Sequence, residues 1–189
     1  MAQTLINNLS YSTLDATKLS GNLPAISGAS LTGVGGLVEY DIWLLSTTFT
    51  GNANPIASNL QRSGVAGFNK IGTGMTESSG IFTFPSTGFY EIGYYIMQYP
   101  ATERFTQHTI DLTTNNSSYA SAVTVTVNLS DIGGGIDGQM GVGHTLFDVT
   151  DTTQCKVRFH ANQQNTSSGL HGNTSYHYTY MTFKKMGDT

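Results

Sequence analysis

The chain has 189 residues, enough for one domain of ordinary size and an extension; only 11% of them are charged, and the formal net charge is −4. Its eight Lys and Arg residues supply no basic patch for a phosphate backbone, and no apolar run approaches the ~20 residues that span a bilayer. We therefore expect no nucleic-acid partner and no membrane insertion.

The composition favours strands over helices. Gly is abundant, with 22 residues, and most of the polarity comes from Thr, Ser and Asn. The single cysteine, Cys155, excludes an intrachain disulfide, and it alternates with Val157 and Phe159 as a buried small side chain does. The first residues lack the basic and apolar regions of a signal peptide. We expect an all-β protein that is stabilised by packing and is not exported by that route.

Residues 1–36 differ from the rest of the chain because they carry a loose repeat. Its units, at 14–21, 23–28 and 29–33, each combine an aliphatic residue, a small hydroxyl residue and a glycine. About ten aliphatic side chains cannot offset the ordering of so long a segment at ~1–2 kcal/mol per residue. Three chains wound together can, so we interpret this segment as an intertwined stalk, with a flexible Gly/Ser linker as the alternative.

The sequence of residues 14–34, LDATKLSGNLPAISGASLTGV, resembles the shaft repeats of tailed-bacteriophage fibres and tail-tip proteins. The resemblance implies a β-structured homotrimer located in the virion tail. It also implies that residues 1–13 attach the stalk to other virion tail proteins.

From residue 37 onward the pattern is one strand after another, without a convincing helix. We expect eight to ten strands, which is typical of an antiparallel sandwich or jelly roll. The strands are predicted at 38–45, 68–71, 81–84, 89–99, 105–112, 123–129, 140–149, 154–161 and 175–186.

The stretch 80–99 is predicted to be a central hairpin that turns at 85–88. Its second strand is apolar on both faces, and Glu91 is its only charged residue. Such a strand needs a second cover, from another layer or another subunit. We expect Glu91 to form an ion pair with Arg104 or Arg158, or a subunit contact.

The motif from Phe82 to Ile92, F-x-F-P-x-x-G-x-Y-x-I, resembles a hairpin of the tumour necrosis factor and complement globular-head superfamily. The segments 146–149, 155–159 and 179–183 resemble its last three strands, although Thr152 to Gln154 replace the usual Gly-Asp pair. The resemblance implies a ten-strand jelly roll whose inner sheets form a homotrimer through aromatic residues. The predicted trimer-interface residues are Tyr90, Tyr94, Tyr95, Tyr178 and Tyr180.

Motifs for catalysis or cofactor binding are absent from the sequence. It contains no G-x-S-x-G, no H-E-x-x-H, no Walker loop and no cysteine pair. We predict that the protein is not an enzyme and has neither a cofactor nor a metal site. The five histidines are interpreted as structural, with a threefold set of imidazoles that binds a metal as the alternative.

Ligand binding is better supported by the segment 160–178, where amides, hydroxyls and aromatic rings alternate. Such side chains suit neutral sugars, because amides donate and accept hydrogen bonds while rings offer apolar faces. The predicted receptor-binding residues are Asn165, His171, Asn173, Tyr176 and His177. The alternative is that this segment is a solvated connection.

Together these features predict a stalk at 1–36 and a jelly-roll head at 37–189. We interpret the protein as a phage tail fibre or tail-tip protein whose trimeric head binds a host surface receptor, with a glycan as the favoured ligand. The alternative is a structural virion protein whose head is a trimerisation cap and binds no receptor.

Overall fold

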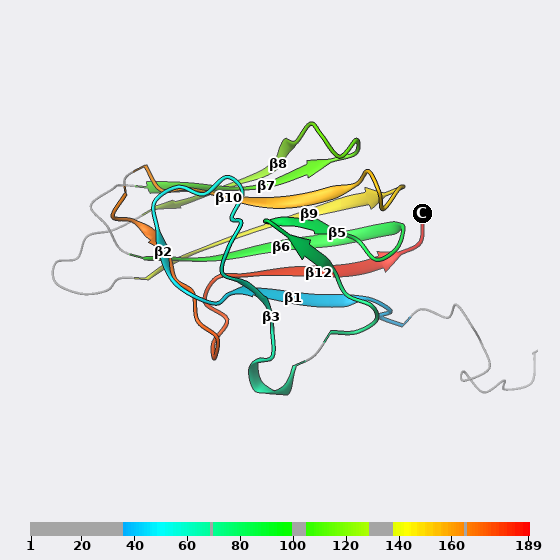
Figure 1. Ribbon diagram of the computed structural model, residues 1–189, viewed down its shortest axis with the longest axis horizontal. Helices are drawn as coiled ribbons and strands as arrows, with labels where there is room; N and C mark the ends of the chain where they lie inside the picture. The colour runs from blue at the N-terminus through cyan, green and yellow to red at the C-terminus, as the bar shows by residue number, and fades with distance from the viewer. Residues whose placement is uncertain (1–35, 69, 100–104, 129–137, 165) are drawn as a thin grey trace, which may run out of the picture. The chain divides into compact units, whose positions relative to one another are not determined.

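The computed structural model describes residues 36–68, 70–99, 105–128, 138–164 and 166–189 (Figure 1). All the elements below belong to one compact unit, Leu37–Thr189. The predicted stalk lies outside the described residues except for Gly36, so it stays a prediction.

The regular secondary structure of the described residues is almost entirely β-strand. Its one helical element is a short 3-10 turn, η3 (Val65–Gly67), and no helix of the described residues is long and apolar enough to cross a membrane. The strands are β1 (Tyr40–Leu45), β2 (Phe49–Thr50), β3 (Leu60–Arg62), β4 (Thr76–Ser78), β5 (Ile81–Thr83), β6 (Gly88–Tyr99), β7 (Phe105–Thr113), β8 (Ala120–Asn128), β9 (Gln139–Val149), β10 (Lys156–Asn162), β11 (Gly169–Leu170) and β12 (Tyr180–Gly187).

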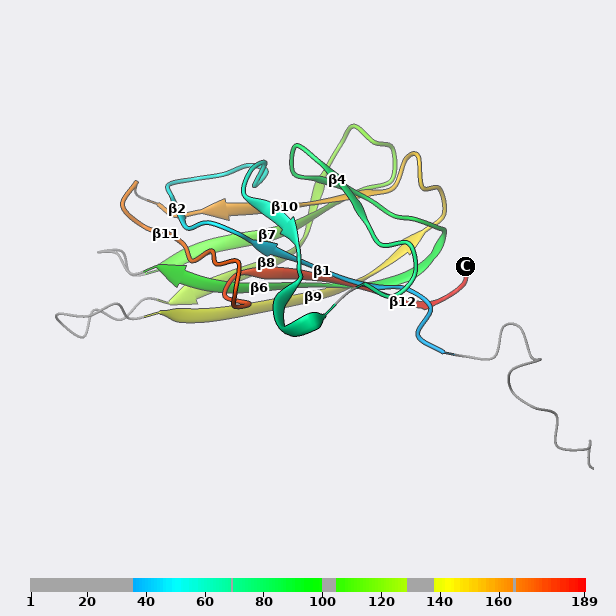
Figure 2. The same cartoon turned by 60° about the horizontal axis from the view of Figure 1, so that its bottom comes forward.

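The strands form two antiparallel sheets that pack face to face (Figure 2). Sheet A has seven strands in the order β2-β11-β6-β12-β1-β3, with β9 paired to the other side of β6. Sheet B has five, in the order β4-β5-β10-β7-β8. Strand β6 is the longest and pairs with β9 over almost its whole length, from Gly88 with Val149 to Gln98 with Gln139. The predicted all-β antiparallel sandwich is thereby confirmed.

The core lies between the sheets and is rich in aromatic rings. On β6 the side chains of Tyr90, Ile92, Tyr94 and Ile96 are fully buried, and they alternate with side chains that point away from the core. Phe82 packs edge-on against Phe159 at a ring-centroid distance of 5.6 Å, which joins the interior of sheet B into one cluster.

Strands β5 and β6 do not form the predicted hairpin. Strand β5 pairs with β4 and β10 in sheet B, whereas β6 pairs with β12 and β9 in sheet A. The turn at 85–88 therefore carries the chain from one sheet to the other. Phe84, just before it, is buried against Tyr90 at a ring-centroid distance of 4.8 Å, so burial of this ring draws the chain across the core.

Two other predictions of strands differ from the structure. The last strand begins at Tyr180, and the preceding residues form turns, because Asn173 Oδ1 accepts the backbone N–H groups of Ser175 and Tyr176. Among the described residues of the strand predicted at 68–71, only Ile71 makes a bridge, with Tyr40.

Two buried acids, Glu39 directly before β1 and Asp41 on β1, fix the loop before β4. Asp41 accepts hydrogen bonds from the indole N–H of Trp43 (2.9 Å), the backbone N–H of Met75 (2.8 Å) and the guanidinium of Arg62 (3.0 Å). Glu39 accepts the backbone N–H of Thr73 (3.0 Å). These charge-assisted bonds compensate the burial of both carboxylates.

Glycines allow β8 to lie directly on β9 where the two sheets meet. A Cβ on Gly141 would come within 2.6 Å of Val127, and one on Gly143 within 2.5 Å of Val125. Because both neighbours are branched side chains of a packed strand, they cannot withdraw without moving β8.

We expect Gly143→Val to destabilise the head by about 1–3 kcal/mol, since it inserts atoms into a filled space. Chemical denaturation followed by the fluorescence of Trp43 measures this. Gly64→Val is the matched control, because a Cβ at Gly64 meets nothing within 4 Å. Equal stabilities of the two variants would contradict the close approach of β8 and β9.

Candidate functional site

One candidate site is the face of sheet A that points away from the core, which we call the outer face. On β6 the side chains of this face alternate with the buried ones. On the neighbouring strands they belong to residues that pair with outward-pointing residues. They come from Tyr40 on β1, Phe89, Glu91, Tyr95 and Met97 on β6, Met140, Val142, His144 and Leu146 on β9, and Tyr180, Thr182 and Lys184 on β12.

The β9 side of the outer face is apolar and uncovered in the single chain. Met140 and Leu146 are each 61% exposed, and Val142 is 48% exposed. Phe89 on β6 adds a further exposed ring. By contrast, the corresponding face of sheet B carries Thr124 and Thr126 on β8 and a partly buried Asp111–Arg158 ion pair (3.2 Å). An apolar patch of this kind marks an interaction surface.

A row of rings crosses the centre of the outer face. His144 meets Tyr95 edge-on (5.2 Å between centroids), and Tyr95 stacks in parallel on Tyr180 (4.3 Å, 4°). His177 continues the row beyond Tyr180 at 5.2 Å. Burial is the main cause that raises the pKa of Tyr180, and the Tyr95 hydroxyl adds to it.

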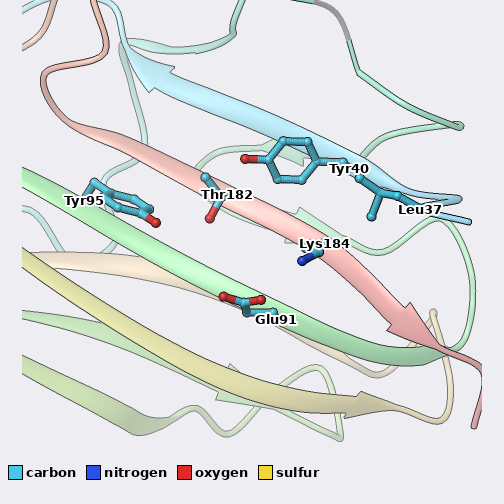
Figure 3. A pocket seen from close by; sticks show the side chains of 6 residues that line it. All are labelled: Leu37, Tyr40, Glu91, Tyr95, Thr182 and Lys184. Atoms are coloured by element: carbon cyan, nitrogen blue, oxygen red, sulfur yellow. The ribbon is translucent and has the colours of Figure 1, made fainter.

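A pocket of about 320 Å³ lies beside this row, between β1, β12 and β6 (Figure 3). Tyr40 and Tyr95 flank it, and Glu91 and Lys184 supply opposite charges from paired positions of β6 and β12. Leu37 and Thr182 complete the lining. The outer face therefore combines a hollow near β1 with apolar side chains that project from β9.

Glu91 pairs with a residue that the sequence did not indicate. Its carboxylate lies 3.3 Å from Nδ1 of His144 on β9. Arg158, one of the predicted partners, lies in the other sheet and pairs with Asp111, so that prediction is wrong. The other, Arg104, lies outside the described residues.

The structure separates the five tyrosines that were predicted to form the trimer interface. Tyr95 and Tyr180 lie together on the outer face. Tyr90 and Tyr94 point into the core of the same subunit and are fully buried, so neither side chain is available to another chain. Tyr178 precedes β12 and contacts His171 instead. Tyr90 and Tyr94 are buried because the alternation along β6 points its even-numbered side chains into the core, whereas Tyr95 points outward.

A second candidate site is the segment His171–Thr179, which we call the distal loop. It lies at the end of the sandwich where β1 ends and β12 begins, opposite the C terminus (Figure 1). Backbone bonds hold it there: the N–H of His171 donates to the Met97 carbonyl (2.9 Å) and that of Asn173 to the Leu45 carbonyl (2.8 Å). Gly172 fits against Thr47 so closely that a Cβ would lie 2.3 Å from its carbonyl carbon.

The distal loop brings together four of the five predicted receptor-binding residues. His171 contacts Tyr178 edge-on at 5.4 Å, and Tyr178 stacks on Tyr176 at 5.8 Å. Asn173 forms the turn that supports Tyr176. His177 lies on the other side, against Tyr180. Asn165 lies outside the described residues. Their binding role stays a prediction.

His177 also forms a short hydrogen bond with a serine, a pairing that sequence reasoning missed. Its Nε2 lies 2.6 Å from Oγ of Ser63, which follows β3. A serine beside a histidine is the start of a nucleophilic site. Here Ser63 is only 4% exposed, so the hydroxyl is not presented to a substrate, and the bond instead ties the distal loop to β3. The described residues contain no group of three or more His, Cys, Asp or Glu that could hold a metal.

Comparison with known proteins identifies the fold and leaves the family open. No protein-family model and no curated protein matches the sequence. Three of the similar solved structures are murine APRIL at pH 5.0, Eiger TNF from S. frugiperda and PRD1 vertex protein P5. APRIL shares 9% identity at a TM-score of 0.58, covering 78% of this chain and 98% of its own. Eiger shares 9% identity at a TM-score of 0.59, and the match covers 82% of this chain and 96% of Eiger. P5 shares 15% identity at a TM-score of 0.50, and the match covers 81% of this chain and 100% of P5.

At these identities the likeness shows the fold alone. The predicted jelly roll of tumour necrosis factor type is confirmed, with β1, β12, β6 and β9 side by side in sheet A. The neighbours are cytokines and a vertex protein rather than enzymes.

One of the five histidines is buried in a polar network inside the core. Nε2 of His108 lies 3.1 Å from Oε1 of Gln98, which also accepts a hydrogen bond from Thr106 (3.2 Å). Burial, with a smaller contribution from the nearby His160, lowers the pKa of His108 to about 3. This histidine has the structural role that the sequence predicted.

Acid should therefore destabilise the head through His108. Its pKa is about 3 in the folded chain and about 6.5 in an unfolded one, so below pH 6.5 only the unfolded chain gains the proton. We expect a loss of about 1.4 kcal/mol per pH unit from this residue between pH 6 and pH 4. Urea denaturation at both pH values should show a smaller difference for His108→Gln than for the unchanged protein and for the control His144→Gln. An undiminished difference in His108→Gln would refute this assignment.

Proposed function

We propose that the protein is the homotrimeric attachment protein of a virion, a phage tail fibre or tail-tip protein whose head binds a host surface receptor. The observation that carries the proposal is the uncovered apolar outer face of sheet A. A head that is soluble and stable needs a cover for this face, and further copies of the same chain are the available partner.

The shape of the outer face favours a ring of copies. The projecting side chains of β9 and the pocket near β1 lie on different parts of one face. When the projection of one copy enters the hollow of the next, the contact is heterologous, and such contacts close into a ring when the rotation allows. Glu91 and Lys184 are the oppositely charged residues of the pocket, so burying it encloses no excess charge at neutral pH.

The fold comparisons support an assembled head on a virus particle. APRIL and Eiger are similar in fold, and the phage protein P5 is by its name a vertex protein. The stalk-like repeat before Gly36 points the same way, since it resembles phage fibre shafts.

The two ends of the head suit an attachment protein. Leu37, where the head begins, lies near Lys184 at the end of β12, and the distal loop lies at the opposite end. Within the head, the distal loop and the residue at which the head begins therefore lie at opposite ends. Three distal loops on one rigid head then bind at a high effective concentration, so that weak contacts sum to durable attachment.

We expect the full-length chain to have the mass of three copies in light scattering at micromolar concentration. Leu146→Lys should reduce that mass to one copy, because it buries three uncompensated charges in the ring. Thr124→Lys, on the exposed face of sheet B, should leave the trimer intact. A monomeric unchanged chain would overturn the proposal, and a trimeric Leu146→Lys variant would exclude this face.

A competition experiment distinguishes a receptor-binding head from a structural cap. We expect an excess of the purified full-length chain to slow the adsorption of the virus that carries it, since soluble trimers occupy the same receptors. Adsorption that is unaffected by a trimeric, folded competitor would favour the structural cap.

A further inference from the structure

We propose that the distal loop is the binding site for a neutral sugar ring, with Tyr176 and Tyr178 as its stacking platform. The inference rests on the proposed function, because it names the class of receptor that the head contacts. It is carried by three observations: a supported aromatic surface, the lack of charged side chains among the described residues around it, and the hydroxyl and amide groups beside the rings.

The aromatic surface is held in place before any ligand arrives. Tyr178 and Tyr176 stack at 5.8 Å with an angle of 22° between their rings, and His171 braces Tyr178 edge-on at 5.4 Å. The backbone N–H of Tyr178 donates to the Tyr176 carbonyl (3.1 Å), and Asn173 holds the N–H of Tyr176 (3.2 Å). A preorganised ring loses little entropy on binding.

The same platform presents an apolar surface to solvent. Tyr176 is 61% exposed, although its inner face rests on Tyr178. One face of a pyranose ring consists of C–H groups, and such a face packs on an aromatic ring. A tyrosine pair therefore suits a sugar better than it suits a phosphate or a carboxylate.

The described residues at this end of the head also lack the charges that an ionic ligand needs. The described residues that border the platform, 46–52, 162–164 and 166–179, contain no Asp, Glu, Lys or Arg. The charged side chains on β1 and β12, such as Asp41 and Lys185, lie in the other half of these strands. An anionic sugar would lose its hydration without gaining a counterion, so the site favours neutral ligands.

Polar groups around the rings can orient a neutral sugar. Thr174 and Ser175 are exposed between Asn173 and Tyr176. Hydroxyl groups both donate and accept hydrogen bonds, as the hydroxyls of a sugar do. Each such bond exchanges for one with water, so stacking supplies most of the affinity and the hydroxyls set the specificity.

The test uses the full-length chain and the methyl glycosides of glucose, galactose, mannose and N-acetylglucosamine, with 3′-sialyllactose as the charged comparison. Saturation-transfer NMR and calorimetry should detect at least one neutral glycoside with a Kd of about 1 mM. Raising the salt from about 0.05 to 0.5 M should change that Kd by less than about twofold, since no ion pair is involved.

Variants separate stacking from a general effect on the fold. We expect Tyr176→Ala to raise the Kd for the glycoside by about tenfold or more. The Kd of Tyr176→Phe should stay within about threefold of that of the unchanged chain, because the ring rather than the hydroxyl makes the contact. Tyr119→Ala is the control, since Tyr119 stacks on Arg158 (4.2 Å) between β7 and β8, away from the distal loop.

Three results would overturn the inference: no binding of any neutral glycoside, preferred and salt-sensitive binding of the sialylated sugar, or unchanged binding in Tyr176→Ala. Light scattering on the same samples keeps this failure distinct from failure of the proposed function. A trimer that competes for adsorption but binds no neutral sugar leaves the attachment protein in place and excludes only the sugar.

Discussion

The structure depends on one strand that needs cover on both faces. The inward face of β6 forms the centre of the core, where Tyr94 and Ile96 are fully buried. Its outward face carries Tyr95 and Met97, and the paired strand β9 extends this surface with exposed aliphatic side chains. Because apolar area left in water is unfavourable by roughly 25 cal/mol per Å², such a face is most stable when a partner removes it from solvent. The proposed assembly of copies would therefore add to the stability of the fold.

The head separates its chemistry along its length. Buried acids, ion pairs and lysines lie in the half that contains Glu39, Asp41 and Lys185, and the distal end relies on amides, hydroxyls and rings. Charge in the first half fixes loops through hydrogen bonds to backbone N–H groups. Its absence from the distal loop leaves a surface whose contacts are short-ranged and insensitive to salt. Attachment by many weak neutral contacts is consistent with this division.

The sequence predicted the fold class, the doubly apolar strand and the loop rich in tyrosine and amides. Alternation along a strand depends only on local geometry, so a clean period such as that of β8 can be read directly. Pairing between distant strands leaves no local signal, which is why β5 and β6 looked like a hairpin. The short strands β2, β3, β4 and β11 contain too few residues to show a period. For a strand that is apolar on both faces, the pattern also cannot tell which face is the core, so it does not separate the buried Tyr90 and Tyr94 from the outward-pointing Tyr95 as interface residues.

The most direct test of the outer face is oxidative footprinting of methionines in the full-length chain at micromolar concentration. Met140 and Met186 are 61% and 55% exposed in the single chain, so a lone subunit would be oxidised at both at similar rates. If copies cover the β9 side of sheet A, Met140 is protected while Met186 reacts. Equal oxidation of the two would contradict the account, because it would leave the apolar face open to water.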